Sequence, residues 1–515
     1  MTKLNTTLLK DLPIKQTSIT DDDYVVVSSG GTKKLKIKDI TKDVEKKAAD
    51  LEEKTTELSE QLDNIKLGKS IGVINGKLFL PSDFPTIPFD IYFIDNKFRC
   101  NLSAKTLTKT DATKVYISCL KGGSGLGETP SNAISLARFS LNLSSSLYSN
   151  VTDFELIFVD KIYIGNEDEF KLENQAINIT FRSGVGFTWF GRVKSKSKST
   201  LSDWVLTDDI YKATLDSSGQ ISDVVNLTKL NEFEMPYIYE NVSSLEECKS
   251  KEGSFYQNGT EIYCNPYSFH DATKSVCVTA TKCLHIRQYK ANKCVFENIG
   301  FLCDSLYYAT DSINNKTYFI DCKFHRGLTN SFSAVGKYSV YLYNCIADYG
   351  SADNFNYHTY DYNSVVVEIN CIAYGAGYFK ISGGNTATAS NNCSTAHEGL
   401  NILRLGCKYW DSEGPTVADI NNCYSININC EAKNCKETNT GYKTSFLFQN
   451  TGTTGRTTQA NKYLINCKGG GNNVKYGIVG TDDTYINNFN GNINFKNEES
   501  VNEIKIIEWE GEIHE

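Results

Sequence analysis

An asparagine or aspartate followed directly by cysteine recurs along this 515-residue chain, and this pair constrains the fold more than any other feature of the sequence. All of its occurrences fall in the second half of the chain. They are Asp321-Cys322, Asn344-Cys345, Asn370-Cys371, Asn392-Cys393, Asn422-Cys423, Asn429-Cys430, Asn434-Cys435 and Asn466-Cys467. A dipeptide confined in this way indicates a structural unit that repeats.

The cysteines are separated by nearly constant intervals. Intervals of 23, 26 and 22 residues lead from Cys322 to Cys393, and Cys407 lies 23 residues before Cys430. Before several of them, apolar residues alternate along the chain and the cysteine continues the apolar face, as in a strand. A repeat of this size without helices predicts an all-β chain folded as a parallel β-helix. At about 23 residues per coil, residues 240–495 provide about eleven coils.

Each residue of the pair has a structural interpretation. Buried cysteine behaves as a small apolar residue, so we expect it to point inward and to stack on the next coil. Asparagine tolerates left-handed backbone and can hydrogen-bond along the stack, so we expect it at a corner. The 17 cysteines include no C-x-x-C spacing, so reduced structural thiols are expected rather than a metal site or another cofactor.

Residues 41–67 are predicted to form a coiled-coil stalk. The heptad seam consists of Val44, Ala48, Leu51, Thr55, Leu58, Leu62 and Ile65. On a single helix such a narrow seam would be exposed, so it indicates a homo-oligomer. The alternative is an amphipathic helix that packs on its own domain.

The remaining segments are predicted to be β structure. Residues 1–40 contain a hairpin, in which Tyr24–Val27 is followed by a glycine turn and a lysine-rich return strand. Residues 68–211 read as successive strands, beginning with a hairpin at Asn75-Gly76, and predict a β-sandwich-like domain. The β-helix is assigned to 212–500, and 501–515 is expected to be a C-terminal cap or tail.

Two parts of the chain resemble phage tail proteins. The hairpin of 1–40 is similar to segments that attach tail fibres to the virion. Three segments farther along the chain resemble pectate-lyase-like β-helix proteins of phage tailspikes: SLEECKSKEGSFYQNGTEIYCNP, SADNFNYHTY and NNCSTAHEGLNILRL. Asn354 and Glu398 replace a glycine and an aspartate of the family's motifs. The resemblance implies a homotrimeric virion protein, folded in the host cytoplasm, whose N-terminus binds other tail or baseplate proteins and whose β-helix binds a host-surface polysaccharide.

The candidate catalytic residues are Asp353, His358, His397 and Glu398, because carboxylates and histidines can act as general acids and bases on a glycan. From Asp353 to His397 the chain advances 44 residues, which predicts two coils and roughly 10 Å along the stack. The structural alternative is that Asp353, Asn356 and His358 cap a turn while His397 packs in a corner. The candidate substrate-binding residues are Tyr357, Tyr360, Tyr362 and Arg404.

These residues are compatible with two functions. One is a tailspike that binds and cleaves a surface glycan, by hydrolysis or elimination, and the other is a receptor-binding or structural tail protein that does not cleave. The formal charge of −8 argues against a nucleic-acid partner. No apolar run is long enough to predict a membrane span.

Overall fold

The computed structural model describes residues 24–28, 32–66, 71–121, 123–165, 177–192, 204–215, 221–232, 234–271, 275–279, 284–287, 293–302, 306–327, 329–378, 391–435, 443–449, 460–479 and 484–487. It divides into two compact units. The first contains Met1–Ile74 with Phe79–Asp83, and the second contains Asn75–Leu78 with Phe84–Glu515.

The first unit contains the predicted hairpin and the predicted helix. Strands β1 (Tyr24–Ser28) and β2 (Thr32–Lys36) pair antiparallel, and α1 (Ile37–Lys66) follows, ahead of the short strand β3 (Gly72–Ile74). At 1.5 Å per residue the 30 residues of α1 extend about 45 Å. The seam residues Leu51 and Leu58 are 67% and 53% exposed. The helix is therefore confirmed, beginning at 37 rather than 41, and the described residues of its apolar seam include exposed leucines.

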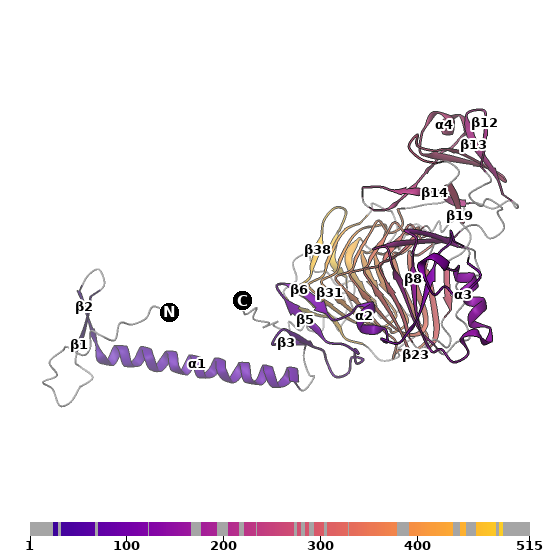
Figure 1. Ribbon diagram of the computed structural model, residues 1–515. Coiled ribbons are helices and arrows are strands. Elements are labelled where there is room, and N and C mark those ends of the chain that lie inside the picture. The colour runs from indigo at the N-terminus through magenta and orange to yellow at the C-terminus, as the bar shows by residue number, and fades with distance from the viewer. Residues whose placement is uncertain are drawn as a thin grey trace. The chain divides into compact units, whose positions relative to one another are not determined.

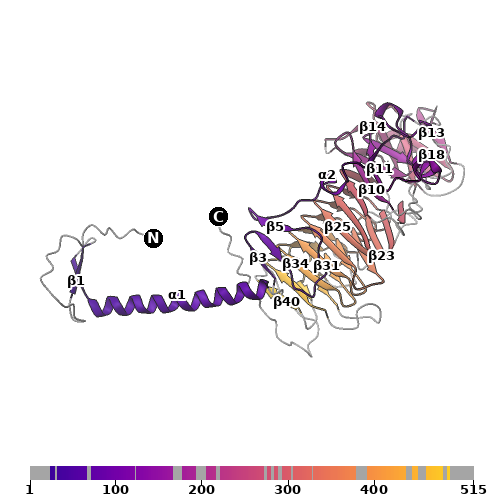
Figure 2. The ribbon, with the colours of Figure 1, turned by 60° about the horizontal axis from the view of Figure 1, so that its bottom comes forward.

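The second unit is mostly β and contains long parallel sheets (Figure 1 and Figure 2). Sheet A consists, in order of pairing, of β7 (Thr113–Ile117), β8 (Asp153–Phe158), β10 (Asn178–Ser183), β21 (Lys293–Glu297), the second half of β23 (Leu306–Ile320), the second half of β25 (Phe332–Tyr343), β28 (Val365–Ile369), β31 (Asn401–Leu405), β34 (Tyr424–Ile428), β37 (Lys462–Ile465) and β40 (Thr484–Asn487).

Sheets B and C repeat the same parallel pairing. Sheet B consists of β20 (Leu284–Arg287), the first halves of β23 and β25, β27 (Phe355–Thr359), β30 (Ser394–Ala396), β33 (Val417–Asp419), β36 (Thr444–Phe448) and β39 (Tyr476–Val479). Sheet C consists of β9 (Ile162–Gly165), β11 (Thr188–Arg192), β22 (Ile299–Leu302), β24 (Lys323–His325), β26 (Ile346–Asp348), β29 (Ile372–Tyr374), β32 (Lys408–Ser412), β35 (Glu431–Cys435) and β38 (Lys468–Gly470).

We call the segment that contributes one strand to each sheet, in the order B, A, C, a repeat. In-register pairing places like side chains on top of one another in the core. The rings of Phe181, Phe296 and Phe319 stack in succession, with centroids 4.6 and 4.9 Å apart. The long apolar strands of sheet A are buried on both faces, as expected for parallel sheets.

Five of the eight recurring pairs occupy a corner, as predicted, and that corner lies between sheets A and C. Backbone φ is positive there at Asn298, Asp321, Asn344, Asn370, Gly406, Asn429 and Asn466. Neighbouring side chains are linked: Asn344 Nδ2 donates to Asp321 Oδ1 at 3.1 Å and Asn370 Nδ2 to Asn344 Oδ1 at 3.3 Å. The following cysteines are buried, and the Cys345 thiol contacts the Phe319 carbonyl of the preceding repeat at 3.3 Å.

The predicted constant period is wrong, as is the assignment of every pair to one corner. Pairing of Ile369 with Leu405 and of Ile372 with Lys408 aligns Cys371 with Cys407, 36 residues later. Three pairs lie elsewhere: Asn392-Cys393 before β30, Asn422-Cys423 before β34 and Asn434-Cys435 at the end of β35. Hydrogen bonding requires that strands align, whereas the connections between them can vary in length.

The predicted β-sandwich over 68–211 is also wrong. Strands β7 to β11 continue sheets A and C, and β10 pairs in parallel with β21 across more than a hundred residues. Periodicity indicates strands but not their partners, which explains the error. Near β7, α3 (Leu136–Leu143) packs Phe139 on Phe154 with ring centroids 5.3 Å apart, and 3-10 turns flank it at Pro130–Asn132 and Ser146–Tyr148.

The described residues between 204 and 279 form a mostly antiparallel insertion, in which only β16 and β17 pair in parallel, instead of the first coils expected from 212. One sheet contains β12 (Val205–Thr207), β13 (Ile210–Thr214), β18 (Glu261–Asn265), β17 (Ser254–Asn258) and β16 (Glu240–Asn241). The other contains β15 (Pro236–Ile238), β14 (Ile221–Leu230) and β19 (Ser275–Thr279). Helix α4 (Leu245–Ser250), capped by Ser244, belongs to this insertion.

The segment that precedes the sheets covers the outer face of sheet A. It contains β4 (Lys77–Phe79), β5 (Ile91–Ile94), β6 (Lys97–Cys100) and α2 (Ala104–Leu107). The Phe84 ring lies edge-on against Tyr424 with centroids 5.3 Å apart, and Asn370 Nδ2 donates to the Phe98 carbonyl at 2.8 Å. The expected cap at 501–515 lies outside the described residues. No described helix has the length and apolarity to cross a membrane.

We predict that the corner thiols react only when the sheets open. Cys345 is fully buried, whereas Cys119 is half-buried, so a maleimide applied without denaturant should label Cys119 first. Mass spectrometry of peptides after timed labelling measures both rates. Labelling of Cys345 and Cys371 as fast as Cys119 in the native protein would contradict this packing.

Candidate functional site

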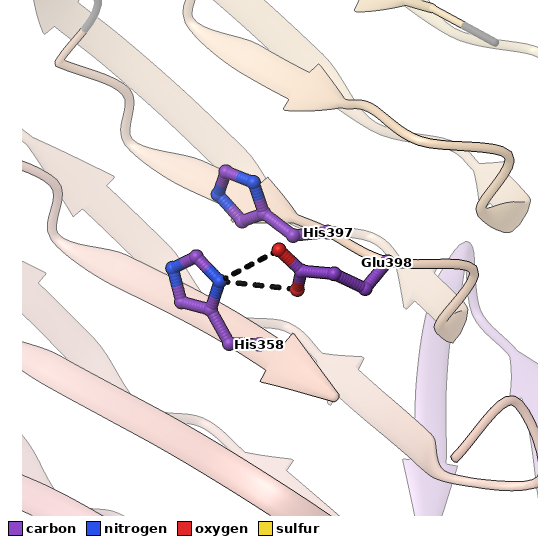
Figure 3. A group of neighbouring side chains, drawn as sticks. All are labelled: His358, His397 and Glu398. Atoms are coloured by element: carbon purple, nitrogen blue, oxygen red, sulfur yellow. Dashed lines mark hydrogen bonds and ion pairs between the residues drawn. The ribbon is translucent and has the colours of Figure 1, made fainter. Parts of the chain in front are cut away.

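Three of the four predicted catalytic residues meet where β27 and β30 of sheet B end (Figure 3). His358 lies in β27, and His397 directly follows β30. The strands pair Tyr357 with Ala396, and the His397 amide donates to the Tyr357 carbonyl at 3.0 Å. The segment that carries Asp353 and His358 therefore lies one repeat from His397, rather than the two coils predicted between Asp353 and His397, because the connection before β30 lengthens this repeat.

Glu398 and His358 form the central contact of the cluster. His358 Nδ1 lies 3.1 and 3.0 Å from the two carboxylate oxygens of Glu398. The His358 and His397 rings stack with centroids 4.1 Å apart and planes 12° apart. Glu398 has φ 55 and Gly399 φ 77, so a tight left-handed turn returns the carboxylate toward His358. This conformation is uncommon for glutamate, and such backbone strain concentrates at functional sites.

His397 is the less accessible histidine. Its Nε2 lies 3.2 Å from Thr395 Oγ1. Burial, together with the neighbouring His358, lowers the pKa of His397 to about 3, although Glu398 opposes this shift. The ring is therefore neutral at physiological pH, and it supports the His358 ring by stacking rather than by charge.

The geometry is that of an oriented base. A carboxylate that accepts the Nδ1 proton fixes the histidine tautomer and leaves Nε2 as the proton acceptor. The His358 side chain is 36% exposed, so this pair can reach a ligand.

The same three residues could also ligate a metal, since their donor atoms lie within 4.8 Å of one another. However, imidazole lone pairs lie in the ring plane, so two stacked rings do not aim at a common ion. The observed arrangement therefore fits proton transfer better than a preformed metal site.

Asp353 is not hydrogen-bonded to the cluster in the part of the chain that the structure describes. It precedes β27, whereas His358 is near the end of that strand. Its Oδ1 accepts a hydrogen bond from the Asn392 amide of the next repeat at 2.6 Å. Burial raises the pKa of Asp353 to about 7, although the Asn392 hydrogen bond and the nearby His358 both oppose this shift. These contacts match the alternative in which Asp353 stabilises a turn.

Asn354, which replaces the family's glycine, is accommodated in the same turn. Its side chain is buried, accepts from the Gly350 amide at 2.9 Å and donates to the Tyr374 carbonyl at 2.8 Å. Asn354 therefore stabilises the turn through side-chain hydrogen bonds, which the family's glycine has no side chain to make.

Two of the predicted substrate-binding residues are core residues. Tyr357 is fully buried and donates its hydroxyl to Glu368 Oε1 at 2.8 Å. Arg404 is also fully buried and binds both oxygens of Asp419 at 2.8 Å. Strand alternation explains this error, since Tyr357 points inward beside the outward-facing His358. Tyr360 and Tyr362, in the turn that follows, are 76% and 54% exposed and remain available to a ligand.

The sequence interpretation missed a buried polar network in the core. Glu368, Arg404 and Asp419 are completely buried, and Tyr409 donates to Glu368 Oε2 at 2.6 Å. Burial raises the pKa of Glu368 to about 7, although Arg404 opposes it. The sequence did contain a signal for this network. Glu368 in VVVEI and Arg404 in NILRL are charged residues at inward positions, where the alternation otherwise gives apolar residues.

We predict that this network makes Arg404 a stability residue rather than a binding residue. Arg404→Met leaves Asp419 buried without its partner and should lower the free energy of unfolding by about 3–5 kcal/mol. Tyr360→Ala, at an exposed side chain, is the control and should change it by less than about 0.5 kcal/mol. Urea unfolding followed by tyrosine fluorescence measures both, and equal stability of the two variants would contradict the assignment.

Comparisons with protein-family models, with curated protein sequences and with solved structures each found no match.

Proposed function

We propose that this chain is a phage tail fibre or tailspike protein: a homo-oligomer, most simply a trimer, that attaches the virion to a host-surface glycan. In this proposal the parallel sheets are the faces of a parallel β-helix that begins at β7, not at 212. The parallel register of A, B and C supports it, since each strand pairs with its counterpart one repeat later.

The observation that carries the proposal is the uncovered seam of α1. Val44, Leu51 and Leu58 are 59%, 67% and 53% exposed, and they lie seven residues apart on one 30-residue helix. Such a seam is stable in water when copies of the helix pack against it, which makes α1 a coiled-coil stalk. A stalk preceded by a small hairpin and followed by a large β unit is the order of parts expected of a virion appendage.

Glycan binding is supported by the surface around His358. Tyr360 and Tyr362 present exposed rings in the turn that follows β27, beside the His358–Glu398 pair. Tyrosine offers an apolar face with a polar edge, which suits a sugar ring and its hydroxyls. In this proposal the N-terminal hairpin binds the virion and this surface binds the host.

The His358–Glu398 pair specifically favours a second function, cleavage of the bound glycan. His358 Nε2 would act as the base, either on a sugar C–H next to a carboxylate or on an attacking water, and Glu398 would hold the ring. The runner-up is a receptor-binding or structural tail protein on the same scaffold, in which these residues only bind.

The stalk proposal predicts an oligomer, and the resemblance to tailspikes makes it a trimer with a mass of three 57.5-kDa chains. Leu51→Asp combined with Leu58→Asp places charges in the seam and should yield monomers, because buried unpaired carboxylates oppose association. Thr56→Asp places the same charge off the seam and should leave the oligomer intact. Sedimentation equilibrium measures the mass, and a monomeric wild-type chain would refute the stalk.

The cleavage proposal predicts that His358 is required for depolymerisation but not for folding. The substrate is the envelope polysaccharide of cells that the purified oligomer binds, and its chain length is followed by size-exclusion chromatography. His358→Ala should abolish shortening and Glu398→Gln should slow it by about 10²–10⁴-fold, the contribution typical of a positioned base. Asp361→Asn, in the adjacent turn, is the control. Binding without shortening by the wild type would instead support the non-catalytic alternative.

A further inference from the structure

We propose a second carbohydrate site, in a cavity of about 940 Å³ that lies between the insertion and the turns that follow the strands of sheet C. Its ligand is an uncharged segment of a glycan. The proposal rests on the proposed function for the source of that glycan, but it uses none of the residues of the His358 cluster. The volume falls within the range of about 300–1,000 Å³ that is usual for small-ligand sites.

The lining of the cavity is rich in tyrosine. Tyr237 and Tyr267 come from the insertion, and Tyr349 and Tyr378 come from the turns beside sheet C. Tyr349 and Tyr378 are 40% and 39% exposed, so part of each side chain can contact a ligand. Tyrosine faces in a concave site suit the C–H faces of pyranose rings, while the hydroxyls can bind sugar oxygens.

Two glycines make room for these rings. A Cβ at Gly375 would lie 2.7 Å from the Tyr349 ring, and one at Gly253 would lie 2.2 Å from the Tyr267 ring. Both glycines have positive φ, 70 and 72. The rings thus lie directly on backbone, which fixes their orientation before any ligand binds.

Backbone strain marks the same cavity. The turn after sheet C requires positive φ in successive repeats, and Gly375, Asp411 and Asn434 supply residue types that tolerate it, with φ 70, 57 and 58. The two preceding repeats place Arg326 and Tyr349 at this position, with φ 57 and 48. Both of these exceptions line the cavity. Residues that break a local rule are expected where a side chain serves a function.

His325 supplies a directed hydrogen-bonding group. Its Nδ1 lies 2.5 Å from Asp348 Oδ1, and the other Asp348 oxygen accepts from the Tyr374 hydroxyl at 2.9 Å. In the tautomer whose Nδ1 proton is held by Asp348, Nε2 is the acceptor. His325 lines the cavity with a side chain that is 10% exposed, and in this proposal its Nε2 accepts a hydrogen bond from a sugar hydroxyl.

The charges around the cavity favour an uncharged sugar over an acidic one. Arg326 is the cation of the lining, and its guanidinium is paired with Asp223 at 3.1 Å. Glu232 lines the cavity and Asp348 lies behind His325. Carboxylates thus balance or exceed the positive charge, so a uronate or sialate would meet repulsion that a neutral hexose would not.

The test measures binding of neutral and acidic oligosaccharides to the full-length oligomer. Isothermal titration uses maltohexaose, cellohexaose and laminarihexaose as neutral probes and hexagalacturonate as the acidic probe. Tyr349→Asn removes the ring but keeps a residue that tolerates the turn, so its melting temperature should stay within a few degrees of wild type. It should weaken binding of a neutral probe by at least about tenfold. Leu120→Asn, at a side chain that is 65% exposed and lines neither site, is the control and should leave this affinity unchanged, while Tyr360→Asn reports binding at the His358 surface.

The outcomes separate this site from the proposed function. Loss of binding in Tyr349→Asn, with weaker binding in His325→Gln and unchanged binding in Leu120→Asn, supports the cavity. Loss of binding only in Tyr360→Asn overturns the cavity but leaves glycan attachment in place. Binding of hexagalacturonate alone, or of none of the probes, also overturns the cavity proposal, whereas attachment is judged separately by binding of the oligomer to host cells.

Discussion

Parallel hydrogen bonding between successive repeats is the constraint on which the rest of the second unit depends. It gives each inward residue a counterpart one repeat above and one below, so that the rings of Phe181, Phe296 and Phe319 form a column. It gives each corner the same backbone conformation, so residues that tolerate positive φ recur there. One pairing rule thus produces both the apolar core and the asparagine ladder, and it permits connections of any length between strands.

Both candidate sites lie where this regularity is interrupted. Glu398 adopts a left-handed conformation to place its carboxylate against His358, and Arg326 and Tyr349 occupy turn positions that other repeats fill with glycine, aspartate or asparagine. Maintaining these departures has a conformational cost, which the hydrogen-bonded strands on either side can offset. The scaffold therefore supplies rigidity, and the residues that deviate from it supply the candidate chemistry.

The interior also departs from an apolar core. Glu368 and Arg404 are aligned on neighbouring strands of sheet A, and Arg404 reaches Asp419 on sheet B. A buried ion pair adds little net stability compared with well-packed apolar side chains, but breaking it is costly. The physical consequence is that the ion pair favours one strand register, because a register shifted by one repeat would leave one of these charges without a partner.

The sequence by itself determined the local features. The heptad pattern predicted a helix that α1 confirms, and the asparagine-cysteine pair predicted a corner with left-handed backbone and a buried thiol. It also grouped His358 with His397 and Glu398, although with the wrong number of repeats between them. These successes share a cause, because side-chain periodicity and backbone tolerance are properties of a few consecutive residues.

Only the tertiary structure decided which strands pair, and so which residues meet. Periodicity could not show that β7 to β11 belong to the same sheets as strands beyond residue 293, because a pairing partner is chosen by long-range hydrogen bonding. Nor could it place Tyr357 and Arg404 in the core, or bring Tyr237 of the insertion beside His325 and Tyr349. A loop of variable length separates such residues in sequence, and the register of the sheets alone sets their distance in space.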